Sequence, residues 1–152
     1  MSISNWTPRL ERLLLTIWVG TLLAIGYLAV PVLFHSLDDN ILAGRLAGQM
    51  FYIVNLIGVT SGIILLLLAY IQDQHNFFRK RRTYLIVTML LLTLTAMLIL
   101  QPQMEAIKAQ LGWHDIAELK ARFGRLHGVS SLLYLVTSVI GVVIVSSTGQ
   151  RR

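Results

Sequence analysis

Four stretches without charge dominate the pattern of hydrophobic and polar positions along the chain. Residues 13–34, 46–72, 83–104 and 126–150 contain no Asp, Glu, Lys or Arg, and each stretch is 22 to 27 residues long. A helix rises about 1.5 Å per residue, so about 20 residues cross the hydrocarbon core of a bilayer. The helices of a soluble bundle would alternate apolar and polar faces, but residues 63–69 and 85–92 are apolar nearly all round. The pattern therefore predicts four membrane-spanning helices.

The predicted fold is all-α: an integral membrane bundle of four transmembrane helices with up-down topology, in a single membrane domain over residues 1–152. The expected spans are about 10–34, 46–72, 83–101 and 126–147. Pro31 is expected to kink the first helix near its far end, and Pro102 to end or bend the third. The polar turn at 36–39 is expected to cap the second helix.

Residues 103–125 carry two short apolar faces, one on each side of Gly112. Faces with this spacing are typical of amphipathic helices. We therefore expect 103–125 to be a surface amphipathic segment of short helices in the loop between helices 3 and 4, with its second piece continuing into the last helix.

Composition supports a membrane protein. Hydrophobic residues make up 55% of the chain and charged residues 13%, where a soluble domain carries about 25% charged residues. The net charge of +6 would suggest nucleic acid for a soluble protein. Here the basic residues lie at the ends of the apolar stretches, which favours contact with the lipid bilayer and excludes nucleic acid as the expected partner.

The basic residues also predict orientation. Eight lie on the side of the termini, including the cluster at 79–82, and five lie on the other side. Basic residues favour the cytoplasmic side, so we expect a protein integral to the plasma membrane, a bacterial inner membrane, with both termini cytoplasmic. The first apolar run is too long for a signal peptide, so we expect it to be a retained helix.

Pairs of small residues recur four positions apart, at Gly44 and Gly48, Gly58 and Gly62, and Gly124 and Gly128. Such pairs let helix backbones approach closely in lipid. They are expected to serve packing inside one bundle, with a homo-oligomer or partner membrane helices as the alternative. Asn55, the most polar residue deep in a span, is expected to form hydrogen bonds between helices.

The sequence predicts no catalytic residue, and we do not expect an enzyme. No charged residue falls in a predicted membrane core, which weighs against a proton-coupled transporter and a voltage sensor. No nucleophile–base arrangement and no phosphate-binding loop is present. Cysteine is absent, which excludes disulfides, thiolate metal ligands and c-type haem.

Histidine is the remaining candidate for cofactor chemistry. His35 and His127 are predicted on the same, outer side of the bilayer, where they could ligate the iron of haem b. They could also hold copper or zinc, with the help of Asp38, Asp39 or Met50. The alternative is that His127 bonds a carbonyl or hydroxyl while His35 faces water or head groups. His114 is expected on the same side, and His75 is expected to be solvated on the other.

Several segments resemble a bacterial membrane family of unknown function that is related to the eukaryotic transmembrane protein 205. Trp18-Val-Gly20 and Pro31-Val-Leu-Phe34 resemble its first helix, and residues 42–51 resemble its second. Residues 123–133, Phe-Gly-Arg-Leu-His-Gly-Val-Ser-Ser-Leu-Leu, look like its most distinctive motif, at the start of the last helix.

The resemblance implies a four-helix integral membrane protein without an established activity. The family is similar in layout to copper-resistance D proteins and to haem-pathway membrane protoporphyrinogen oxidases, which supports a metal or haem site by analogy. The motif makes His127 the residue of interest. The eukaryotic relative is associated with cisplatin resistance, which suggests an efflux component as a further hypothesis.

The favoured interpretation is a small multi-pass membrane protein that packs as a bundle or oligomer and catalyses no reaction. The main alternative is a haem b- or copper-binding membrane protein with His127 and His35 near the outer face. This alternative includes a redox enzyme.

Overall fold

The computed structural model describes residues 6–72, 77 and 80–148. Four of its helices are long and apolar enough to cross a membrane. They comprise Thr7–Ser36, Asn40–Gln72, Arg81–Lys108 and Ala117–Ser147, and the described ranges contain no strand. This confirms the prediction of an all-α fold with four candidate membrane spans. His75, Arg79, Arg151 and Arg152 lie outside the described residues.

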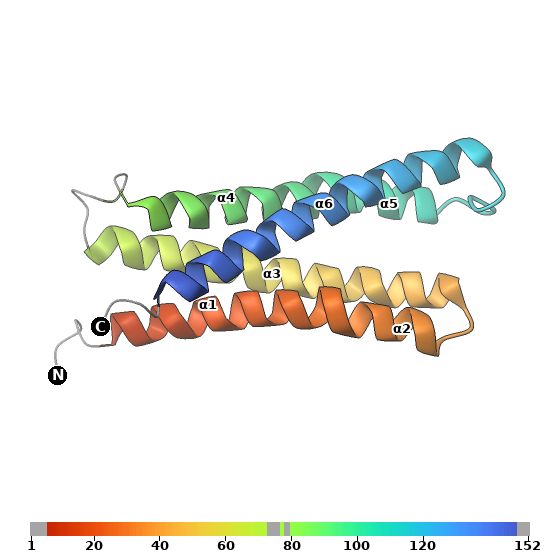
Figure 1. Ribbon diagram of the computed structural model, residues 1–152. Coiled ribbons are helices and arrows are strands. Elements are labelled where there is room, and N and C mark those ends of the chain that lie inside the picture. Colours follow the sequence, from red (N-terminus) through yellow and green to blue (C-terminus); the bar gives the residue numbers. More distant parts are fainter. Residues whose placement is uncertain (1–5, 73–76, 78–79, 149–152) are drawn as a thin grey trace.

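The chain runs back and forth through the bundle (Figure 1). Its elements in order are α1 (Thr7–Ala24), η2 (Ile25–Ala29), α2 (Val30–Ser36), α3 (Asn40–Gln72), α4 (Arg81–Thr95), η4 (Ala96–Leu100), α5 (Gln101–Lys108) and α6 (Ala117–Thr148). α1 packs against α3, α3 against α4, and α4 against α6, which returns to α1 and closes the ring. We call the end where α1 begins and α6 ends the proximal end, and the opposite end the distal end.

A short polar turn joins α2 to α3 at the distal end. The Oδ1 atom of Asp39 accepts hydrogen bonds from the backbone N–H groups of Ile41 at 2.8 Å and Leu42 at 3.1 Å. These donors have no partner inside the helix, so a carboxylate at this position satisfies them. The predicted cap of the second span is confirmed.

Neither internal proline ends its helix. Pro31 lies in the first turn of α2 and Pro102 in the first turn of α5, and a π-helical turn precedes each one. In these turns the N–H of Val30 bonds to the carbonyl of Ile25, and that of Gln101 to Ala96, five residues back. The wider turn relieves the clash of a proline ring with the carbonyl four residues before it, so the helix continues.

This continuation corrects the predicted boundaries after Pro102. α5 extends the third span to Lys108, and α6 already begins at Ala117. Within the expected segment at 103–125, helix lies on both sides of a connection at 109–116, and the second piece continues into the last helix as expected. That the segment lies at the membrane surface stays a prediction. Gly112 lies in this connection with a φ of 68°, a left-handed conformation that glycine adopts without steric cost.

The buried core lies toward the proximal end. It joins the side chains Leu15, Trp18, Val19 and Leu22 of α1 to Val54 and Leu65 of α3, Ile86 and Met89 of α4, and Ile144 of α6. The distal half of α6 differs, because residues 117–136 include no buried residue. The distal half of α6 is thus less closely packed against the bundle than its proximal half.

Polar contacts tie helices together near both ends. At the proximal end, Arg82 pairs with Glu11 at 2.6 Å, and the same carboxylate accepts a hydrogen bond from Gln72 at 2.5 Å, which joins α4, α1 and α3. At the distal end, Gln101 and Lys108 of α5 donate to carbonyl groups of α3. The span interior itself carries no charged side chain.

Candidate functional site

Gly58 and Gly62 form the seat of a buried tryptophan. A methyl group added to Gly58 would lie 2.5 Å from Nε1 of Trp18, and one added to Gly62 would lie 3.2 Å from its six-membered ring. Trp18 is 0% exposed. The close approach requires glycine at position 58, because a methyl group there would overlap the indole, and it leaves little room for a methyl group at position 62.

Gly44 and Gly48 face the α5 side of the bundle at the distal end. The Gln101 side-chain amide donates to the Gly48 carbonyl at 3.2 Å, and the Lys108 ammonium donates to the Gly44 carbonyl at 3.4 Å. Lys108 also pairs with Glu105 at 2.9 Å. This pair of glycines therefore admits polar side chains from the same chain against the backbone of α3.

Gly124 and Gly128 have different surroundings from the other two pairs. A methyl group added at either position would meet no atom within 4 Å. Both residues are exposed, as is Ser131, which lies on the same face of α6. Among the three predicted pairs, this one faces open space in the described structure.

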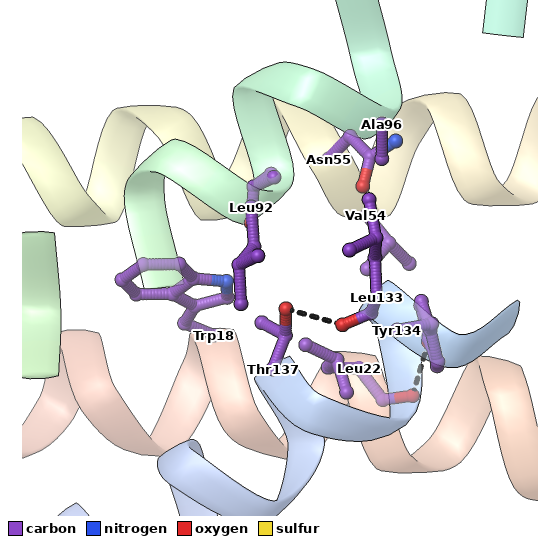
Figure 2. Close-up of a pocket in the computed structure, with 10 residues that line it drawn as sticks. Trp18, Leu22, Val54, Asn55, Leu92, Ala96, Leu133, Tyr134 and Thr137 are labelled. Atoms are coloured by element: carbon purple, nitrogen blue, oxygen red, sulfur yellow. Dashed lines mark hydrogen bonds between the residues drawn. The ribbon is translucent and has the colours of Figure 1, made fainter. Parts of the chain in front are cut away.

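A small pocket lies between the four spans, at the middle of each (Figure 2). Its volume is about 10 Å³, close to the least that a single water molecule needs. Most of the lining is apolar, and the polar side chains come from Asn55, Thr93, Tyr134 and Thr137. Three of these donate their hydroxyl protons to backbone carbonyls: Thr93 to Met89, Tyr134 to Leu22 and Thr137 to Leu133.

Tyr134 enters the hydrogen-bond ladder of the first span. Its hydroxyl donates to the Leu22 carbonyl at 2.5 Å, and the tyrosine side chain lies directly against Gly26. In an uninterrupted α-helix the N–H of Gly26 would bond to the carbonyl of Leu22. The tyrosine hydroxyl therefore lies where that backbone hydrogen bond would otherwise form. Its ring covers Gly26 and makes an edge contact with Phe51 at 5.2 Å.

Sequence reasoning missed Tyr134. The local signal was Gly26, which leaves room for the ring, together with Pro31, which favours a widened turn before it. Neither residue indicates which helix supplies the hydroxyl, because Tyr134 is 112 residues away from Leu22.

The structure does not bring the two predicted histidine ligands into contact. His35 is exposed in the last turn of α2, which packs on α3, and His127 is exposed on α6, whose distal part packs on α5 and η4. No ring contact joins the two imidazoles in the described ranges. Asp39, a suggested additional ligand, caps α3. Haem or copper binding by these histidines stays a prediction.

His127 belongs instead to a row of aromatic rings at the distal end. It stacks on Phe123 with ring centres 5.9 Å apart, Phe123 contacts Trp113 at 4.8 Å, and Trp113 contacts His114 at 3.7 Å. Lys108 lies over the Phe123 ring at 5.8 Å. Aromatic rings of this kind favour the membrane–water interface. The described residues contain no group of three or more His, Asp or Glu arranged to hold a metal ion.

Comparison with known proteins gives one match. A family model described as a domain of unknown function (DUF4149) matches residues 13–112. No curated protein and no solved structure matches the chain. The motif at 123–133 lies outside the matched residues, so the more specific relation to transmembrane protein 205 stays a prediction.

Proposed function

The chain belongs to the DUF4149 family of domains of unknown function, and from that premise we propose that it is a non-enzymatic membrane component that self-associates through the distal half of α6. The observation that carries the proposal is the open surface at Gly124 and Gly128. The other two glycine pairs contact side chains of the same chain, whereas no atom lies within 4 Å of a methyl group built at either of these positions.

The distribution of buried residues along α6 supports the same surface. In α3 the buried residues extend from Ala43 near its start to Leu65 near its end. In α6 the first buried residue is Thr137, twenty residues after the helix begins. Lipid gives apolar helices no hydrophobic reason to associate, so close backbone packing and hydrogen bonds are the available driving forces. Gly124, Gly128 and the Ser131 hydroxyl offer both.

A second copy of this chain is the occupant that we propose. Two copies inserted in the same orientation place their α6 helices at the same depth, and a two-fold axis along the membrane normal brings identical glycine pairs together. The surface is then self-complementary. A helix from a different protein at this position is an outcome that the experiment below distinguishes.

The absence of cysteine from the chain makes cross-linking a clean test. Ser131→Cys introduces one thiol on the proposed interface, and Thr60→Cys introduces one on the exposed side of α3 as a control. We expect oxidation in native membranes to give a disulfide-linked dimer at position 131 and not at position 60. Equal cross-linking at both positions would indicate random collision and overturn the proposal.

Glycine substitutions measure the strength of the association. Gly124→Leu combined with Gly128→Leu should weaken the dimer at least about tenfold, which corresponds to about 1.4 kcal/mol, in analytical ultracentrifugation with detergent. Gly20→Leu is the matched control, because a methyl group built on Gly20 of α1 also meets no atom within 4 Å. A monomer at every concentration, or a 131 cross-link only to another protein, would contradict self-association.

The same preparation tests the cofactor alternative. A Soret band, or copper at one equivalent per chain, that His127→Ala abolishes would replace the proposal with a cofactor-binding function. A colourless and metal-free protein from cells supplied with haem and copper would remove that alternative.

A further inference from the structure

The two π-helical turns have equivalent local architecture. η2 begins at Ile25, six residues before Pro31, and η4 begins at Ala96, six residues before Pro102. The N–H of Ile25 bonds to the carbonyls of Thr21 and Leu22, and the N–H of Ala96 bonds to those of Leu92 and Thr93. Leu22 in the first span therefore corresponds to Thr93 in the third, and Gly26 corresponds to Met97.

A hydroxyl group completes the first of these turns. The Tyr134 hydroxyl donates to the Leu22 carbonyl at 2.5 Å, and the tyrosine side chain lies directly against Gly26. A widened turn disturbs the regular ladder of hydrogen bonds, and an inserted polar group re-satisfies the backbone inside a membrane, where no bulk water is present.

No side chain performs this role at the second turn in the part of the chain that the structure describes. The Thr93 hydroxyl is already directed to the Met89 carbonyl, and no side-chain donor reaches the Thr93 carbonyl. Instead, the small pocket lies against this turn, since Thr93 and Ala96 both line it. At the η4 turn, a cavity therefore lies where the tyrosine hydroxyl lies at the η2 turn.

The polar side chains of the pocket fit one small ligand that both donates and accepts hydrogen bonds. Asn55 contributes an amide that has no hydrogen-bond partner among the described residues, with both donor and acceptor capacity. Thr137 has donated its proton to Leu133, so its oxygen remains an acceptor. Figure 2 shows the Asn55 amide and the Thr137 hydroxyl directed into the space between the helices.

We propose that this pocket binds one water molecule, held by Asn55, which completes the η4 turn as the Tyr134 hydroxyl completes η2. The volume of about 10 Å³ admits one water and excludes a larger solute, and a buried water needs two to four polar partners. The Asn55 amide and the Thr137 oxygen supply two of them, and we assign the third to the carbonyl of Thr93, which also lines the pocket. The Asn55 side chain is half-buried, and an amide in the membrane interior without a hydrogen-bond partner costs several kcal/mol, which this water offsets.

The test measures contact between Asn55 and water by NMR in lipid nanodiscs. Selective ¹⁵N labelling of asparagine gives four side-chain amide signals, and the Asn55→Gln variant identifies one of them. We expect a nuclear Overhauser effect between the Asn55 amide protons and a long-lived water, while these protons exchange slowly with bulk deuterated solvent. Asn40, exposed at the distal end, should exchange quickly.

Thr137→Val removes one water partner at nearly constant shape and should abolish the effect at Asn55 without loss of the helical circular-dichroism signal. Thr60→Val, on the exposed face of α3, should leave it unchanged. No water contact at Asn55 in the unsubstituted protein would overturn the proposal. So would a direct hydrogen bond from the Asn55 amide to the Thr93 carbonyl, detected as a scalar coupling across that bond.

Discussion

Trp18 links the core of the protein to its glycine pattern. The indole has no exposed surface and lies on Gly58 and Gly62 of α3, which present bare backbone to it. A large aromatic ring fitted against glycines gives extensive van der Waals contact, the main source of helix association in lipid. The match is specific, because neither a smaller ring nor a larger neighbour would preserve it.

Gly58→Ala should therefore destabilise the protein by about 1–3 kcal/mol, the usual cost of overpacking a core. The added methyl group would lie 2.5 Å from Nε1 of Trp18, so the fully buried ring must move. Thermal unfolding in detergent, followed by tryptophan fluorescence, measures the change. Gly20→Ala is the control, since it adds the same group in open space and should cause no loss. Equal melting temperatures for the two variants would contradict the close contact between Trp18 and Gly58.

At the scale of the helix, two prolines coexist with continuous spans because a π-helical turn precedes each one. The first turn depends on a distant element, since Tyr134 of α6 bonds to the Leu22 carbonyl and lies against Gly26. This contact joins the last span to the first near the middle of the bundle. The distal parts of the helices, by contrast, have fewer buried contacts.

Tyr134→Phe should cost about 1–2 kcal/mol, because it removes the hydroxyl that donates to the Leu22 carbonyl. The Gly26 amide should also exchange faster with solvent deuterium. Mass spectrometry of exchanged peptides and thermal unfolding give the two measurements. Tyr52→Phe removes a hydroxyl from a side chain that is 49% exposed, and it should change neither. A Tyr134→Phe protein with unaltered exchange at Gly26 would show that the hydroxyl does not hold the turn.

The four spans were predictable from sequence, whereas the contacts between them were not. Whether a segment carries ionised side chains, which lipid excludes, can be read from that segment alone. The charge-free stretches therefore located every span. Spacing of glycines shows that a close approach is possible but not which group approaches. Gly58, Gly48 and Gly124 share one pattern, yet they face an indole, polar side chains and open space respectively. The π turns were missed because proline was expected to end or kink a helix.

At the scale of the whole molecule, an even number of spans places the start of the first span and the end of the last span on one side of the membrane. α1 begins and α6 ends at the proximal end (Figure 1). The connections at 37–39 and 109–116 lie at the distal end. The fold fixes which segments share a side, but it leaves open which side is cytoplasmic. The basic residues predict that choice, because positive charge favours the cytoplasmic side.

The cluster at 79–82 should therefore control orientation. Replacing Arg79, Lys80 and Arg81 by Gln leaves five basic residues on each side and spares Arg82, which pairs with Glu11. With the native sequence, a fluorescent reporter fused after Arg152 should be active in the cytoplasm, and a phosphatase inserted at 109–116 should be active in the periplasm. The triple variant should insert in both orientations, because the charge bias that selects one orientation is removed. The fluorescent reporter and the phosphatase should then each be active in only part of the molecules. Unmixed native signals in the variant would assign orientation to another feature, and a native protein with its C-terminal reporter in the periplasm would reverse the predicted topology.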